Sequence, residues 1–141
     1  GPLRPDQIRD ITQFILNWEA TALGGKSPEI LELPAPLSAD PVARGKFVFN
    51  SQGCAACHVI EGLSAGLVGP DLTHIGTVAA ARVDGMSAED YLRESIINPN
   101  AFITPECPTG DCLPDTMPQN FVDKISPEQI EDLIAFLLAQ E

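Results

Sequence analysis

The stretch that decides the fold is GCAACHVIEG, residues 53–62. Cys54 and Cys57 are separated by two alanines, and His58 follows the second cysteine directly. A Cys-x-x-Cys pair occurs in structural zinc centres, in redox-active dithiols and at covalent attachment points for haem. The function that the sequence predicts depends on which of these three sites the stretch forms.

A zinc centre or a dithiol accounts for only part of the pattern. Zinc would take Cys107 and Cys112 as its other ligands, because structural zinc wants four tetrahedral ligands. The two cysteine pairs are far apart in sequence, however, and zinc gives no role to a histidine directly after Cys57. A thioredoxin-like dithiol lies at the start of a helix that follows a strand, and no strand is predicted before residue 53. Both alternatives stay open, with the weaker support.

Covalent haem explains every residue of the motif, because Cys-x-x-Cys-His is the attachment signature of haem c. The two thiols add to the two vinyl groups on one edge of the porphyrin. The turn between them then brings His58 under the ring, where its imidazole can bind the iron as the proximal ligand. The sequence thus predicts one covalently bound haem c, held by Cys54, Cys57 and His58.

The sixth position of the iron has three candidate ligands, Met86, Met117 and His74. Met86 has a structural role available, as the hydrophobic residue that precedes a predicted helix. Met117 lies in LPDTMPQNF, residues 113–121, between two prolines and with no helical or strand pattern around it. A stiff, proline-flanked loop can hold a weak ligand at a fixed distance. We therefore expect Met117 to be the second axial ligand, with a higher reduction potential than bis-histidine ligation gives.

Helices account for the regular structure that the sequence predicts. They are expected at 4–19, 41–51, 88–97 and 127–141. Asp40, Ser87 and Ser126 are suitable N-caps, and Gln129 completes a capping box with Ser126. The segments 59–86 and 98–125 show no sustained pattern and are predicted as long loops. The fold class is therefore all-α.

The first and last predicted helices resemble each other. PDQIRDITQFILNWE (5–19) and PEQIEDLIAFLLAQE (127–141) share seven of fifteen residues without a gap. Common helix composition is one explanation, and an internal repeat is the other. With a repeat, residues 1–23 are left from a preceding copy of the domain, residues 24–39 form a Pro/Gly-rich linker, and residues 40–141 are the domain itself.

Composition excludes some classes of function. The 141 residues contain 20 acidic and 8 basic side chains, a formal charge of −12. This balance argues against nucleic acid as a partner, because phosphate binding needs clustered cations. It suits a partner with a basic docking face, or it serves solubility alone. No apolar run approaches the roughly 20 residues of a membrane-spanning helix.

Several motifs in the same order resemble those of class I cytochromes c in their bacterial form, over residues 40–141. They are GKFVFNSQGCAACH (45–58), GPDL (69–72), TMPQNF (116–121) and ISPEQIEDLIAFLL (125–138). The resemblance implies that Gly45 and Phe49 let the closing helix cross the first one. It also implies that the Pro70 carbonyl accepts a hydrogen bond from the proximal imidazole, a brace on the ligand. ESIINPNAFI (94–103) is similar to cytochrome domains of respiratory or photosynthetic complexes, such as alternative complex III or oxidase subunit II fusions.

Other residues have roles that pattern alone leaves open. Ile75 and Phe121 are expected to pack on the haem, as are Leu72, Ile96 and Phe102. Arg82 is either an ordinary exposed arginine or a partner for a haem propionate, and His74 is expected to be a surface residue. The insert ECPTGDC (106–112) departs from the family pattern, and an oxidising compartment favours a Cys107–Cys112 disulfide over two free thiols.

The resemblance implies a function in electron transfer rather than in catalysis. Haem c proteins mature outside the cytoplasm, so we expect the periplasm or the outer face of the membrane. The partners would be redox proteins, within a multi-haem or membrane-bound complex or outside one. The alternative is a haem-based gas sensor or a peroxidase-like enzyme in which Met117 dissociates from the iron.

Overall fold

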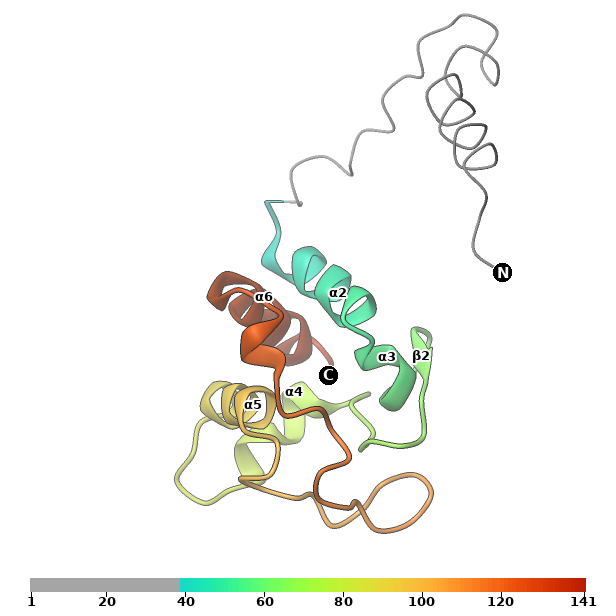
Figure 1. Cartoon of the computed structure of the whole chain (residues 1–141). Coiled ribbons are helices and arrows are strands. Elements are labelled where there is room, and N and C mark those ends of the chain that lie inside the picture. Colours follow the sequence, from blue (N-terminus) through green and yellow to red (C-terminus); the bar gives the residue numbers. More distant parts are fainter. Residues whose placement is uncertain (1–38) are drawn as a thin grey trace, which may run out of the picture. The chain divides into compact units, whose positions relative to one another are not determined.

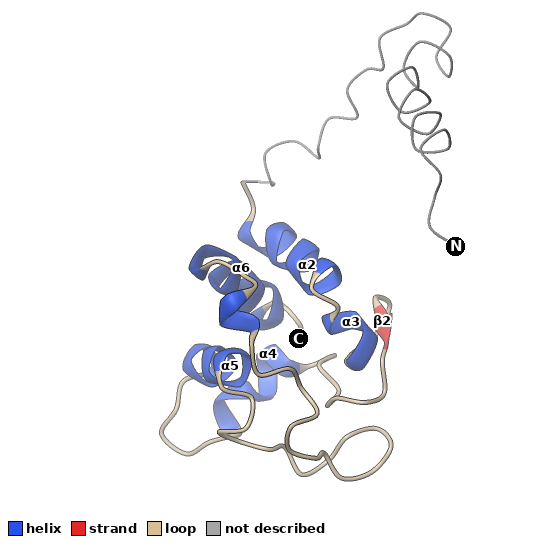
Figure 2. Cartoon of the chain, viewed as in Figure 1, coloured by secondary structure: helices blue, strands red, loops and turns tan. Residues whose placement is uncertain are grey.

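The computed structural model describes residues 39–141 (Figure 1). The helix predicted at 4–19 and the linker predicted at 24–39 lie outside this range, apart from Ala39. Helices and loops dominate the described part, as Figure 2 shows. In chain order the elements are α2 (Pro41–Ser51), α3 (Cys54–Cys57), β1 (Val59–Ile60), β2 (Ser64–Ala65), α4 (Ile75–Val78), η1 (Ala79–Ala81), α5 (Ala88–Ile97), η2 (Phe121–Asp123) and α6 (Pro127–Leu138).

The caps predicted for the three longer helices are present. The Asp40 carboxylate accepts a hydrogen bond from the Val42 amide, at 3.0 Å, and Pro41 opens α2. Ser126 and Gln129 form the expected capping box at the start of α6. The Ser87 hydroxyl accepts a hydrogen bond from the Asp90 amide at the start of α5. These local signals place the helix starts where the sequence predicts them.

Helix α6 is shorter than predicted, because it ends at Leu138 rather than at residue 141. The Gln140 carbonyl accepts a hydrogen bond from the Gly76 amide of α4, at 2.8 Å. A side chain at Gly76 would overlap the Leu138 carbonyl. The last residues of the chain therefore bond to α4 instead of continuing the helix.

Helices α2 and α6 pack closely, as the Gly45 and Phe49 pattern predicts. A Cβ atom at Gly45 would overlap the Asp132 carbonyl and lie 2.6 Å from the Phe136 Cβ. The rings of Phe49 and Phe136 follow, with centroids 5.5 Å apart. Arg44 donates from Nε and Nη2 to the two oxygens of Asp132, at 2.7 and 2.5 Å, so a bidentate ion pair joins the same two helices. The packed rings and this ion pair together hold α2 against α6.

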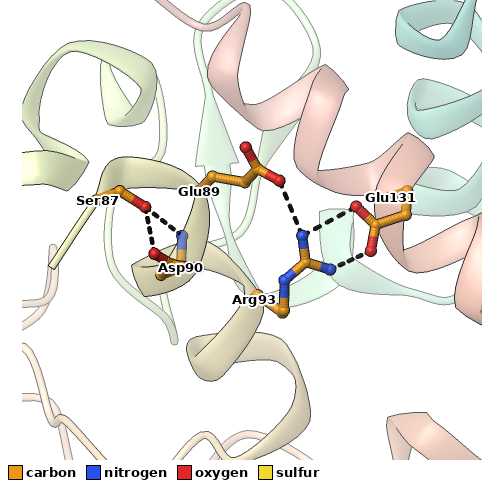
Figure 3. Close-up of polar contacts among 5 residues, drawn as sticks. All are labelled: Ser87, Glu89, Asp90, Arg93 and Glu131. Atoms are coloured by element: carbon orange, nitrogen blue, oxygen red, sulfur yellow. Dashed lines mark hydrogen bonds and ion pairs between the residues drawn. The ribbon is translucent and has the colours of Figure 1, made fainter.

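A second ion pair joins α5 to α6 at the surface (Figure 3). Arg93 of α5 donates to both oxygens of Glu131 of α6, and it also contacts Glu89 one turn earlier. The Arg93 guanidinium lowers the pKa of Glu131. Beneath it, the apolar face of α5 is buried in the core through Tyr91, Leu92 and Ile96. Helix α5 is thus held in place by its buried apolar face and by the ion pair with α6.

Short elements interrupt the segment 59–86, which the sequence predicts as one loop. Strands β1 and β2 pair antiparallel, with Val59 opposite Ala65 and Ile60 opposite Ser64. Elements of two to four residues are too short for a periodic pattern, so sequence reasoning cannot find them. No helix of the described residues is long and apolar enough to cross a membrane.

Candidate functional site

A cavity of about 200 Å³ lies among α3, α5, the start of α4 and the loop that follows α5. All eight residues predicted to bind haem line this one cavity, although they come from distant parts of the sequence. They are Cys54, Cys57, His58, Pro70, Ile75, Arg82, Met117 and Phe121.

The two cysteines of the motif lie on the one-turn helix α3. Gly53 precedes it with a φ of 79°, a left-handed conformation that glycine adopts without strain. Cys54 and Cys57 are three residues apart in the helix, so their side chains lie on the same face. Both thiols are free of disulfides and half-buried at the cavity wall. This is the placement that attachment to one edge of a flat ring requires.

His58 ends α3 and is held by a neighbouring loop. Its Nδ1 lies 2.9 Å from the Pro70 carbonyl oxygen. With Nδ1 protonated, the ring donates this bond and leaves Nε2 free for a metal. Burial lowers the pKa of His58, and the hydrogen bond to Pro70 partly opposes that shift. A neutral imidazole in a fixed orientation is the form that binds iron.

The loop over His58 requires glycine. A Cβ atom at Gly69 would lie 2.6 Å from Cε1 of His58 and 2.8 Å from its Nδ1. The amides of Val68 and Gly69 both donate to the Cys57 carbonyl, at 3.1 and 2.8 Å. The loop is therefore pressed against the imidazole and bonded to the motif itself.

Of the three candidates for the sixth position, Met117 alone lines the cavity among the described residues. Met117 is half-buried, packs against the core and accepts a hydrogen bond at its carbonyl from the Gln119 side chain, at 2.8 Å. Met86 packs against the core elsewhere. His74 is exposed at the start of α4. The geometry brings a thioether and an imidazole to the same cavity.

Apolar side chains form most of the remaining wall. The predicted residues Leu72, Ile96 and Phe102 are there beside Ile75 and Phe121. The structure adds further wall residues that the sequence did not single out. Tyr91, Leu92 and Leu137 lie on helices α5 and α6, whose apolar faces periodicity assigns to the core, and Ile103 and Leu113 lie in the loop between α5 and η2. Helical spacing identifies a buried face, but it cannot say whether protein or cofactor covers that face.

Among the described residues that line this cavity, Arg82 is the only Lys, Arg, Asp or Glu. The side chain is half-buried, and its Nε is buried without a hydrogen-bond partner among the described residues. A buried donor without a partner is costly, and native structures rarely leave one. An anionic group in the cavity would satisfy it, and haem carries two propionates. Two thiols on one face, an oriented imidazole, a thioether, apolar walls and an unsatisfied cation together fit haem c.

The two alternative sites do not fit. Cys107 and Cys112 form a disulfide, so they cannot supply thiolates to zinc. No group of three or more His, Cys, Asp or Glu side chains in residues 39–141 is arranged to hold a metal ion. Burial raises the pKa of the Cys54 thiol, whereas reactive dithiols have a lowered pKa. Helix α3 also follows α2 rather than a strand.

Comparison with known proteins identifies a family. The model of the family described as Cytochrome c matches residues 42–141, from the start of α2 to the end of the chain. No curated protein matches, and no solved structure matches. The matched range includes the Cys54–His58 motif, the Pro70 loop and Met117.

Proposed function

The chain belongs to the cytochrome c family, whose domains bind covalent haem c, and on that premise we propose that it carries single electrons between redox proteins. Haem iron supplies the chemistry, by changing between its ferric and ferrous states. The chain's own residues attach the group, ligate it, exclude water and leave one edge accessible. We propose no catalytic residue.

Each of the eight residues predicted to bind haem has a role in this proposal. Cys54 and Cys57 would form the thioether links, and His58 and Met117 would ligate the iron, as in the class I cytochromes c that the sequence resembles. Pro70 orients His58 through its carbonyl oxygen. Three further residues line the cavity and would contact haem there: Ile75 and Phe121 as apolar walls, and Arg82 as the partner of a propionate.

One observation carries the proposal. An imidazole that is held by the Pro70 carbonyl and a thioether line the same apolar cavity, beside two free thiols on one helical face. With both axial positions taken by protein ligands, a change of oxidation state needs little rearrangement. Electron transfer benefits from such a site, whereas substrate chemistry needs an open position.

Charge indicates the kind of partner. Residues 47–81 and 94–123, which include both loops around the cavity, contain no lysine and no arginine. They do carry carboxylates, among them Glu61, Asp71, Glu106 and Asp111. Leu67, beside the His58 loop, is 51% exposed and supplies an apolar contact. We propose a redox partner with a basic docking face, because opposite charges steer encounter.

The cellular setting is also a proposal. Covalent haem attachment and the Cys107–Cys112 disulfide both suit an extracytoplasmic location. The likeness of ESIINPNAFI to cytochrome domains of respiratory or photosynthetic complexes, alternative complex III and oxidase subunit II fusions among them, supports membership of such a complex. The repeat of 5–19 in 127–141 supports a multi-haem parent.

A gas sensor or peroxidase-like enzyme is the second candidate, and it has less support. Its chemistry would need Met117 to leave and an acid–base group to assist. His58 is the sole imidazole among the described lining residues, because His74 lies outside the cavity. The electron carrier therefore remains the better explanation.

The test combines spectra with ligand binding. We expect the purified protein to keep its colour after acid-acetone extraction and to titrate as a one-electron couple. Carbon monoxide should bind the reduced protein slowly, and Met117→Ala should make that binding fast, whereas Met86→Ala should not. Extractable pigment would refute covalent attachment. Fast binding to the unmodified protein would favour the sensor or enzyme.

A further inference from the structure

The segment that carries Met117 has little regular structure. Between the end of α5 and the start of η2, the described chain forms one isolated bridge, Cys107 with Gly110, and no helix or longer strand. Segments of this kind open locally at low free-energy cost. A ligand on such a segment stays in place only if other contacts restrain the backbone next to it.

Asn100 and Asp115 supply such a contact across the segment. The Asn100 amide donates from Nδ2 to the Asp115 carboxylate, at 2.7 Å. In return, the Asp115 backbone amide donates to Oδ1 of Asn100, at 3.0 Å. Asp115 has a φ of 59°, and Pro114 precedes it. Proline followed by a residue with positive φ is the pattern of a type II turn. Pro114 and Asp115 therefore favour a turn directly before Met117.

The other end of this pair is anchored in the core. Asn100 comes directly after Pro99, which is buried and lines the cavity. Pro99 follows α5, whose buried face and ion pair with α6 fix its position. The Asn100–Asp115 pair therefore ties the backbone two residues before Met117 to the rigid end of α5.

We propose that Asn100 and Asp115 are a positioning pair that holds Met117 at the ligand position. This inference rests on the proposed function, since it takes Met117 as the second axial ligand. Neither residue touches the cofactor, because neither lines the cavity. Their effect is on the fraction of molecules in which the thioether is correctly placed, and a smaller competent fraction weakens ligation in proportion.

The test is Asn100→Ala, which removes both hydrogen bonds and leaves Asp115 free to keep its positive φ. We expect the rate of carbon monoxide binding to the reduced protein to rise on the order of tenfold, the factor that about 1.4 kcal/mol corresponds to. The far-red sulfur-to-iron absorption band of the oxidised protein should weaken, and the reduction potential should fall. Asn120→Ala is the matched control, because Asn120 is an exposed asparagine of the same segment whose side chain makes no cap bond. It should leave all three measurements unchanged.

A swapped pair gives the decisive comparison. Asn100→Asp combined with Asp115→Asn exchanges the two side chains but keeps both hydrogen bonds, because a carboxylate at 100 can accept from the amide side chain and from the backbone amide at 115. We expect it to restore slow carbon monoxide binding. The proposal is overturned if Asn100→Ala binds carbon monoxide at the unmodified rate. It is also overturned if the swapped protein has the thermal unfolding temperature of the unmodified protein but still binds carbon monoxide fast. If Met117→Ala itself leaves the far-red band intact, the assignment of Met117 fails, and that outcome is separate.

Discussion

Gly69 shows how a residue without a side chain can confine a neighbouring ring, here the imidazole of His58. Its backbone lies against the His58 ring, and a methyl group there would lie 2.6 Å from Cε1. Gly69→Ala must therefore move the imidazole or the loop. We expect a loss of about 1–3 kcal/mol in the free energy of unfolding, the usual cost of overpacking, measured by denaturant titration of the haem protein.

The neighbouring residue provides the comparison for Gly69. Val68 is 53% exposed, so Val68→Ala should change the free energy of unfolding by about 0.5 kcal/mol or less. Equal effects of the two substitutions would show that the ring is not confined by Gly69.

Arg82 leads to a prediction about the reduction potential. A cation in the cavity wall favours the ferrous state, because that state carries one positive charge fewer. Arg82→Leu should therefore lower the potential, on the order of 60 mV for a tenfold change in a one-electron equilibrium. Potentiometric titration measures this directly, and Arg82→Lys should lose much less because it keeps the charge.

A second arginine controls for global charge. Arg93 is bonded to Glu131 and Glu89 at the surface and does not line the cavity. Arg93→Leu should leave the potential nearly unchanged. If both substitutions lower the potential equally, Arg82 acts through net charge and not through its place in the wall.

The sequence predicts the role of a single residue best when the residues of one site are also close together in the chain. Cys54, Cys57 and His58 lie within one five-residue motif, so the motif alone predicts that they share a site. Gly69 and Arg82 show the limit, because their roles depend on which distant atoms approach them. The hydrogen bond between His58 and Pro70 was expected only from the family resemblance, and the structure contains it.

At the scale of elements, the close approach of α2 and α6 depends on Gly45. A Cβ atom there meets backbone of α6, which cannot move aside as a flexible side chain can. Gly45→Ala should separate the helices and lower the free energy of unfolding by about 1–3 kcal/mol. Lys46→Ala, at an exposed neighbouring position, should have little effect. Thermal and denaturant unfolding compare the two variants, and similar stability in both would contradict a close crossing.

The disulfide hairpin is the second element with a testable effect. Cys107 and Cys112 close a small loop, and the Thr109 hydroxyl bonds to the Leu67 carbonyl, at 3.2 Å. The hairpin thereby connects the Met117 segment to the loop beside His58. Replacing both cysteines by serine should lower the free energy of unfolding by about 2 kcal/mol, the entropy estimate for a loop of this length.

The reducing agent offers a control for the disulfide. A thiol reagent should lower the free energy of unfolding of the unmodified protein by the same amount. It should break only the Cys107–Cys112 disulfide, because thioether links to haem resist reduction. It should not affect the variant without Cys107 and Cys112. A variant as stable as the unmodified protein would show that the hairpin is held by its hydrogen bonds alone.

The sequence predicts the starts of the longer helices better than it predicts helix ends and short elements. The starts of α2, α5 and α6 follow from local caps, and the structure has them where expected. The end of α6 and the short elements between 59 and 86 depend on contacts such as Gly76 with Gln140. Local sequence carries no signal for bonds between distant segments.

At the scale of the whole molecule, we expect the acidic charge to steer encounters with redox partners. With a formal charge of −12, the protein should reduce or oxidise a small cationic complex, such as hexaammineruthenium, faster at low salt. Stopped-flow rates should fall as ionic strength rises, since the screening length shrinks to about 10 Å at 0.1 M. An anionic complex such as hexacyanoferrate should show the opposite trend. Two identical salt dependences would refute electrostatic steering.

The mainly helical fold and the cytochrome c family could be predicted, because helix periodicity and the family motifs are spread along the whole domain. The cavity could not, since its wall combines α3, α5, α6 and two loops. A one-dimensional pattern says which residues are apolar, but only the packed chain says which of them leave space between them.

The contrast between the tightly packed α2–α6 core and the sparsely bonded Met117 segment has a kinetic consequence. Backbone amides in α6 should exchange with deuterium only when the whole domain unfolds, whereas those between 111 and 120 should exchange through local opening. As denaturant is added, the segment on the sulfur side should therefore detach first. If Met117 ligates the iron as proposed, the earliest partly unfolded species would keep the imidazole–iron bond and have an open coordination position, so small ligands should reach the iron before the helices are lost.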